Sequence, residues 1–151
     1  MSWTRLAHNL WFAALPSRTM PPFDSTNTYV IADGAVGLVV DPGFDTPEAL
    51  ASLTSQLDAS GVRFVKAVLL THTHPDHVAG LEQISSALGE PAVYVHPLEA
   101  ERLPQGLPVR ALQHERVLMA GDVDVKALHT PGHSPGHLSF HLISTSPSRA
   151  R

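Results

Sequence analysis

Four potential metal ligands follow an apolar run in the segment Val68-Leu69-Leu70-Thr71-His72-Thr73-His74-Pro75-Asp76-His77-Val78-Ala79-Gly80. His72 and His74 are two residues apart, so in an extended chain both imidazoles leave on the same side and can converge on one ion. Asp76 and His77 are adjacent and could serve a second ion about 3.5–4 Å from the first. A polar loop with incidental histidines is the alternative interpretation. The spacing H-x-H-x-D-H after a buried strand favours a metal site.

The composition is typical of one globular domain. The chain has 151 residues, of which 43% are hydrophobic, and this length supports one core. The net charge is −4 and lysines and arginines form no cluster, so we expect no binding to nucleic acid. Cysteine is absent, which leaves nitrogen and oxygen as metal ligands. We find no signal-peptide pattern and no apolar run near about 20 residues, so we expect a cytoplasmic protein without membrane association.

The first two thirds of the chain alternate predicted strands and helices. Thr46 and Pro47 begin a predicted helix that ends near Ala59, and Gly89 stops a second one that begins near Leu81. A short third helix is predicted over His96–Leu103. Five segments have the apolar or β-branched content of strands, and the second and third form a hairpin through Asp33-Gly34: Leu10–Leu15, Thr28–Ala32, Val36–Val40, Val65–Leu70 and Ala92–Val95.

The last third has strand periodicity interrupted by a histidine-rich loop. Strands are predicted over Val117–Met119, Val123–His129 and Leu138–Ile143. Between the last two, Pro131, Gly132, Pro135 and Gly136 surround His133 in a tight loop. His133 is therefore the best candidate for a third nitrogen ligand to the ion held by His72 and His74. Residues 1–143 are predicted to form one domain and residues 144–151 a disordered tail.

Other polar residues next to predicted strands allow two interpretations each. Asp41, at the end of a buried strand, is either a loop cap or a support for a metal-bound histidine. His96 follows a strand, and helix capping or surface exposure is favoured over a ligand role. His8 and His114 are interpreted as surface residues.

With Asp41, T-H-T-H-P-D-H at 71–77 and H-T-P-G-H-S-P-G-H at 129–137, the chain resembles the metallo-β-lactamase fold superfamily, especially its glyoxalase II-like hydrolases. The resemblance implies an α/β fold, an αβ/βα sandwich of four layers with the metals at one edge. It implies that His72, His74 and His133 hold the first ion and that Asp76 and His77 hold the second. Asp41 matches the acidic residue that supports the site.

The chain also departs from this family's pattern. The family's bridging aspartate and last histidine lie beyond the third motif, and no Gly-Asp follows Ile143 here. Gly121-Asp122 precedes His133 and cannot fill that role in chain order. His137 and His141 match strand positions, so we expect neither to be a ligand. We therefore expect mainly the first half of a family domain, C-terminally incomplete. Its second sheet would be incomplete, with an exposed face through which copies could self-associate.

The leading hypothesis is a metal-dependent hydrolase that acts on a small-molecule thioester, ester, lactone or lactam through a metal-bound hydroxide. One or two Zn2+ ions are expected, with Fe or Mn as alternatives. Asp76 could also take part in proton transfer, as a catalytic residue. Two other functions remain open: a truncated, non-catalytic remnant or partner subunit of such a hydrolase, and an iron-dependent sulfur dioxygenase of the same fold.

Overall fold

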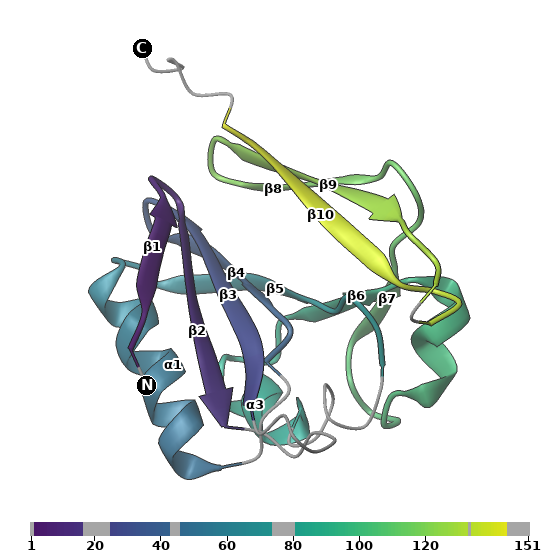
Figure 1. Cartoon of the computed structure of the whole chain (residues 1–151). Coiled ribbons are helices and arrows are strands. Elements are labelled where there is room, and N and C mark those ends of the chain that lie inside the picture. Colours follow the sequence, from purple (N-terminus) through teal and green to yellow (C-terminus); the bar gives the residue numbers. More distant parts are fainter. Residues whose placement is uncertain (1, 17–24, 43–45, 74–80, 133, 145–151) are drawn as a thin grey trace.

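A computed structural model describes residues 2–16, 25–42, 46–73, 81–132 and 134–144, which form two sheets and three short helical elements (Figure 1). The larger sheet has the strand order β1-β2-β3-β4-β5-β6-β7 and the smaller one β10-β9-β8. The strands of the larger sheet are β1 (Thr4–Ala7), β2 (Leu10–Pro16), β3 (Ser25–Asp33), β4 (Val36–Val40), β5 (Phe64–Leu69), β6 (Ala92–Val95) and β7 (Val109–Ala111).

The first four strands of the larger sheet are antiparallel neighbours. The predicted hairpin is confirmed, because β3 ends at Asp33, β4 begins at Val36, and Gly34 has the positive φ of 61° that a tight turn requires. Sequence patterns did not predict β1 and β7. All four residues of β1 are exposed and β7 has three residues, so neither carries an apolar alternation.

The other half of the sheet is parallel, and its crossovers are helical. From β4 to β7 each strand pairs with the next in parallel. The connections contain α1 (Pro47–Ala59), α3 (Leu81–Ala87) and η1 (Pro97–Arg102), a 3-10 helix. The predicted start of α1 is confirmed, since the Thr46 side chain accepts a hydrogen bond from the Ala49 N–H at 3.2 Å. Buried Leu53 and Leu57 of α1 pack against one face of the sheet with Val30 and Val39.

The smaller sheet covers the opposite face of the larger one (Figure 1). It consists of β8 (Val117–Ala120), β9 (Val123–His129) and β10 (Leu138–Ser144), all antiparallel, and β10 runs one residue past the predicted domain boundary. Val123 and Val125 pack on Leu38 and Leu69. Between the sheets is a cavity of about 290 Å³, lined by Leu10, Tyr29, Ile31, Val40, Thr71, Phe140 and Leu142.

The described residues form three of the four layers that the resemblance implies. Within the described residues three layers are present: helices, the seven-stranded sheet and the three-stranded sheet. The outer face of the small sheet exposes the side chains of Val117, Met119 and Ile143. Self-association through this face stays a prediction. Among the described helices, none has the length and apolar character needed to span a membrane.

Candidate metal centre

The site is built where two neighbouring parallel strands end. In the register of β4 and β5, Val40 lies beside Leu69, so Asp41 and Thr71 leave the sheet at the same edge. Ligand sites in open α/β sheets form outside the carboxyl ends of the strands, because loops from several strands meet there. The histidine motif therefore begins at the edge of the sheet where the loops after β4 and β5 meet.

The backbone of Asp41 is held in an uncommon conformation. Its φ of 53° lies in the left-handed region, which few residues other than glycine adopt. Its N–H donates to the Leu69 carbonyl at 2.9 Å, and its own carbonyl accepts from the Thr28 hydroxyl at 3.0 Å. These bonds hold the strained backbone and direct the buried carboxylate toward Thr71.

Thr71 connects Asp41 to His72. Its N–H donates to Asp41 Oδ1 at 2.8 Å, and its hydroxyl donates to Asp41 Oδ2 at 2.6 Å. His72 Nδ1 lies 2.8 Å from the same hydroxyl oxygen. The single hydroxyl proton is given to the carboxylate, so the second bond must be donated by the imidazole Nδ1–H. In the neutral ring, Nε2 then carries the lone pair, which is the form of histidine that binds a divalent metal.

The ring of His72 also packs against the histidine-rich loop. The His72 side chain is buried, and its ring centroid lies 5.4 Å from that of His137, with the planes at 29°. Thr130 closes the loop, since its N–H donates to the His137 carbonyl at 2.9 Å and its hydroxyl oxygen lies 3.0 Å from His137 Nδ1. Leu138 N–H donates to the Thr71 carbonyl at 2.8 Å, which joins the two loops directly.

The placement expected for His137 is wrong, and that for His141 is right. His141 lies within β10, with an exposed side chain. His137 precedes β10, in a turn that begins at Ser134, and so reaches His72. The proline and glycine content of the loop allows this turn, which strand periodicity did not predict. That neither histidine is a ligand stays a prediction.

Glu99 is a site residue that the sequence did not reveal. Its side chain is 0% exposed although it lies in a surface 3-10 helix. Oε1 accepts from Thr73 N–H at 3.2 Å and from the Thr73 hydroxyl at 3.0 Å, and Oε2 accepts from Gly136 N–H at 2.8 Å. Arg102 Nη1 lies 3.6 Å from Oε1. The two hydrogen-bond partners are 26 and 37 residues away in the chain, so no local pattern identifies them.

The contacts of Glu99 favour its charged form. Burial raises the pKa of the carboxyl, but the hydrogen bonds from Gly136 and Thr73 and the positive charge of Arg102 lower it. The net result is a pKa below the ordinary value of 4.5. Glu99 is therefore a carboxylate at neutral pH, and it accepts hydrogen bonds without donating one.

His96 caps the helix that carries Glu99, as the favoured interpretation predicted. Its Nδ1 accepts from the Leu98 N–H at 3.1 Å, and its ring stacks on that of His129 with centroids 4.3 Å apart. Burial and the nearby His129 lower the pKa of His96, and Glu99 opposes this shift. His129 Nε2 lies 2.8 Å from the Pro135 carbonyl oxygen, so this histidine pair supports the loop after β9. His8 and His114 are exposed, as predicted.

The structure describes two of the predicted site residues, Asp41 and His72, and brings them together through Thr71. The other predicted residues lie outside the described residues: His74, Asp76, His77 and His133. Within the described ranges, no group of three or more histidine, aspartate or glutamate side chains could hold a metal ion. The predicted ligand set is thus untested. The tautomer of His72 and its hydrogen bond to Thr71, which is held by Asp41, fit a histidine that binds a metal.

The fold is shared with solved metallo-β-lactamases. The structure of LRA-12, a class B3 di-zinc metallo-β-lactamase from an Alaskan soil metagenome, superposes with a TM-score of 0.73 at 18% identity. The match covers 94% of this chain and 57% of that one. The family model of the metallo-beta-lactamase superfamily matches residues 21–145. The chain belongs to that superfamily.

Two curated relatives are hydrolases by name. An atrochrysone carboxyl ACP thioesterase from Passalora fulva is 31% identical over 85% of this chain and 37% of its own length. A hydroxyacylglutathione hydrolase from Tolumonas auensis is 28% identical over 84% of this chain and 47% of its own length. The chain therefore spans less than half the length of either relative.

Proposed function

We propose that the chain carries the metal-binding part of a hydrolase that cleaves a small-molecule thioester. The observation that carries this proposal is the hydrogen-bonded series Asp41–Thr71–His72. It fixes the imidazole in the tautomer with an unprotonated Nε2 at the strand edge where the motif continues into His74, Asp76 and His77. A carboxylate that acts through a neighbour on a metal-bound histidine typically orients the ring and raises its basicity.

His72, His74 and His133 would hold the first ion, and Asp76 and His77 would hold or orient a second. Zinc is proposed because the fold neighbour LRA-12 is described as di-zinc and because the donor set is nitrogen and oxygen. When bound, such an ion would lower the pKa of a water ligand to about 7 and would polarise the carbonyl of the substrate. Asp76 would accept and return a proton, while Asp41 and Thr71 keep His72 in its binding form.

The thioester class is proposed from the chemistry that the relatives' names state. A thioesterase and a hydroxyacylglutathione hydrolase both cleave an acyl–sulfur bond. Esters, lactones and lactams present the same electrophilic carbonyl and are the competing substrates.

The proposal is tested by hydrolysis assays on chelator-treated protein reconstituted with zinc or with ferrous iron. We expect zinc to support thioester hydrolysis above lactone hydrolysis, and His72→Ala to lower kcat/KM by about a hundredfold or more. His141→Ala replaces an exposed histidine outside the site and should leave the rate unchanged. Thioester cleavage that survives both chelation and His72→Ala would contradict the proposal. Oxygen consumption by the iron form would indicate the dioxygenase alternative.

A further inference from the structure

We propose that Glu99 is a positioning residue, which locks the loop that carries His72 to the loop that carries His137 and thereby sets the geometry of the metal centre. This inference rests on the proposed function. It assigns the carboxylate no contact with the substrate or the reacting atoms, because its oxygen atoms are engaged by the two loops.

The two oxygens of Glu99 divide between the two loops. Oε1 holds Thr73, the residue between His72 and His74, by both its backbone N–H and its hydroxyl. Oε2 holds the N–H of Gly136, the residue before His137. One rigid carboxylate thus spans segments that come from different sheets, since the first follows β5 and the second precedes β10.

The backbone of Gly136 lies close against the Glu99 side chain. A Cβ atom added at Gly136 would lie 2.6 Å from Glu99 Cγ and 3.1 Å from His96 Nδ1. A side chain there would push the carboxylate away from the loop, because neither neighbour is the far end of a flexible side chain. Gly136 therefore lets the backbone approach the buried acid closely enough to donate.

Because the Glu99 carboxylate is buried, its hydrogen bonds to the two loops depend on its negative charge. Glu99 is 0% exposed, so water cannot replace a lost partner, and the half-exposed Arg102 supplies the compensating positive charge. In Glu99→Gln, an amide nitrogen replaces one carboxylate oxygen and can only donate. It would then face a donor at Thr73 or at Gly136, and because the amide can turn either way, each of the two loops loses its acceptor for part of the time.

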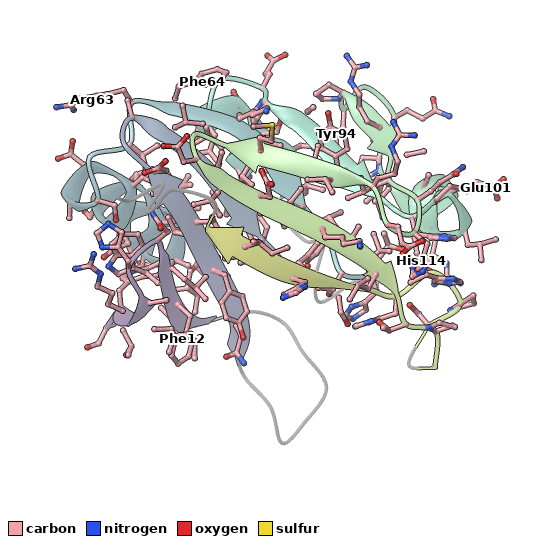
Figure 2. The ribbon with its side chains drawn as sticks, turned by 90° about the horizontal axis from the view of Figure 1, so that it is seen from above. Phe12, Arg63, Phe64, Tyr94, Glu101 and His114 are labelled. Atoms are coloured by element: carbon pink, nitrogen blue, oxygen red, sulfur yellow. The ribbon has the colours of Figure 1, made fainter. Side chains whose placement is uncertain are left out.

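The matched control lies two residues along the same helix. Glu101 is exposed and lies at the outer rim of the molecule (Figure 2), so Glu101→Gln makes the same chemical change away from both loops. Thr73→Val is a milder second variant. It removes one hydrogen bond to Glu99 and keeps the charge, in case Glu99→Gln does not fold.

The experiment measures two quantities on each variant. The first is zinc affinity by competition with a chelator. We expect about a 10–100-fold loss for Glu99→Gln, a smaller loss for Thr73→Val and none for Glu101→Gln. The second is hydrogen exchange of the Thr73 and Gly136 amides in metal-free protein, which Glu99→Gln should accelerate at both positions together. A residue with a merely local structural role would not couple two amides 63 positions apart in the chain.

The two readouts separate the inference from the function on which it rests. Unchanged zinc affinity in a folded Glu99→Gln, or accelerated exchange at only one of the two amides, would overturn the inference. Failure of the wild-type chain to bind zinc would overturn the proposed function, while the exchange of the two amides would still decide whether Glu99 joins the loops.

Discussion

Asp41 and Thr71 are joined by two hydrogen bonds, one from the Thr71 N–H to Oδ1 at 2.8 Å and one from its hydroxyl to Oδ2 at 2.6 Å. This double contact decides which way the hydroxyl points, and so which nitrogen of His72 carries the proton. A strained aspartate backbone at the end of β4 thus controls the chemistry of an imidazole in another loop.

Asp41→Asn should reverse this arrangement. If the amide oxygen keeps the Thr71 N–H, the amide nitrogen faces the hydroxyl and donates to it, and the hydroxyl proton turns toward His72 Nδ1. We expect the Nε2–H tautomer in metal-free protein, read from imidazole nitrogen chemical shifts. Zinc affinity should fall about 10–100-fold with the same metal content at saturation. Thr71→Ser, which keeps the hydroxyl, is the control. Loss of a whole equivalent of metal at saturation would instead make Asp41 a direct ligand.

The docking of α1 is tested by Leu53→Ala. Leu53 is 0% exposed and packs in the cluster between this helix and the seven-stranded sheet. We expect the free energy of unfolding to fall by about 2–5 kcal/mol, since a cavity adds to the lost transfer free energy. Leu98→Ala, at a 59% exposed leucine, should cost less than about 0.5 kcal/mol. Equal effects of the two changes in denaturant melts would show that α1 is not docked.

The stability of metal-free protein should depend on pH through Glu99. The folded-state pKa of this carboxyl lies below its ordinary value of 4.5, so the charged group stabilises the fold above that pH. The contribution is lost as the pH falls below about 4.5 and through the folded-state pKa. The stability difference between the wild type and Glu99→Gln should therefore shrink on acidification. A difference that stays constant from pH 7 down to acid unfolding would contradict this assignment.

Self-association is expected through the outer face of the small sheet. Val117, Met119 and Ile143 lie on this face, where the register pairs Met119 with Asp124 and Asp124 with Ile143. Met119→Lys should reduce the weight-average mass in sedimentation at high concentration, and the new charge can pair with Asp124. Leu98→Lys places the same charge at an exposed leucine outside this face and should have no effect. Identical masses for all three proteins would rule out this face.

Elements with a strong local signal were predictable from the sequence. The Asp33-Gly34 turn, the Thr46 cap of α1 and the apolar β5 each depend on neighbours in the chain, and each is confirmed. The predicted short helix after His96 is present, but as a 3-10 helix. The role of Glu99 could not be predicted, because its partners come from two other loops. The contact of His137 with His72 was missed for the same reason, since it arises only when the sheets pack.

The central claim is that His72 is a metal ligand in the tautomer set by Thr71 and Asp41. The most direct test is the zinc content of purified wild type, His72→Ala and His141→Ala after dialysis, measured by elemental analysis. The account predicts about one tightly held equivalent in the wild type and in His141→Ala, because three imidazoles complete a zinc site that leaves one position open to water. It predicts that His72→Ala loses this equivalent. A His72→Ala protein that retains the wild-type zinc content would contradict the account.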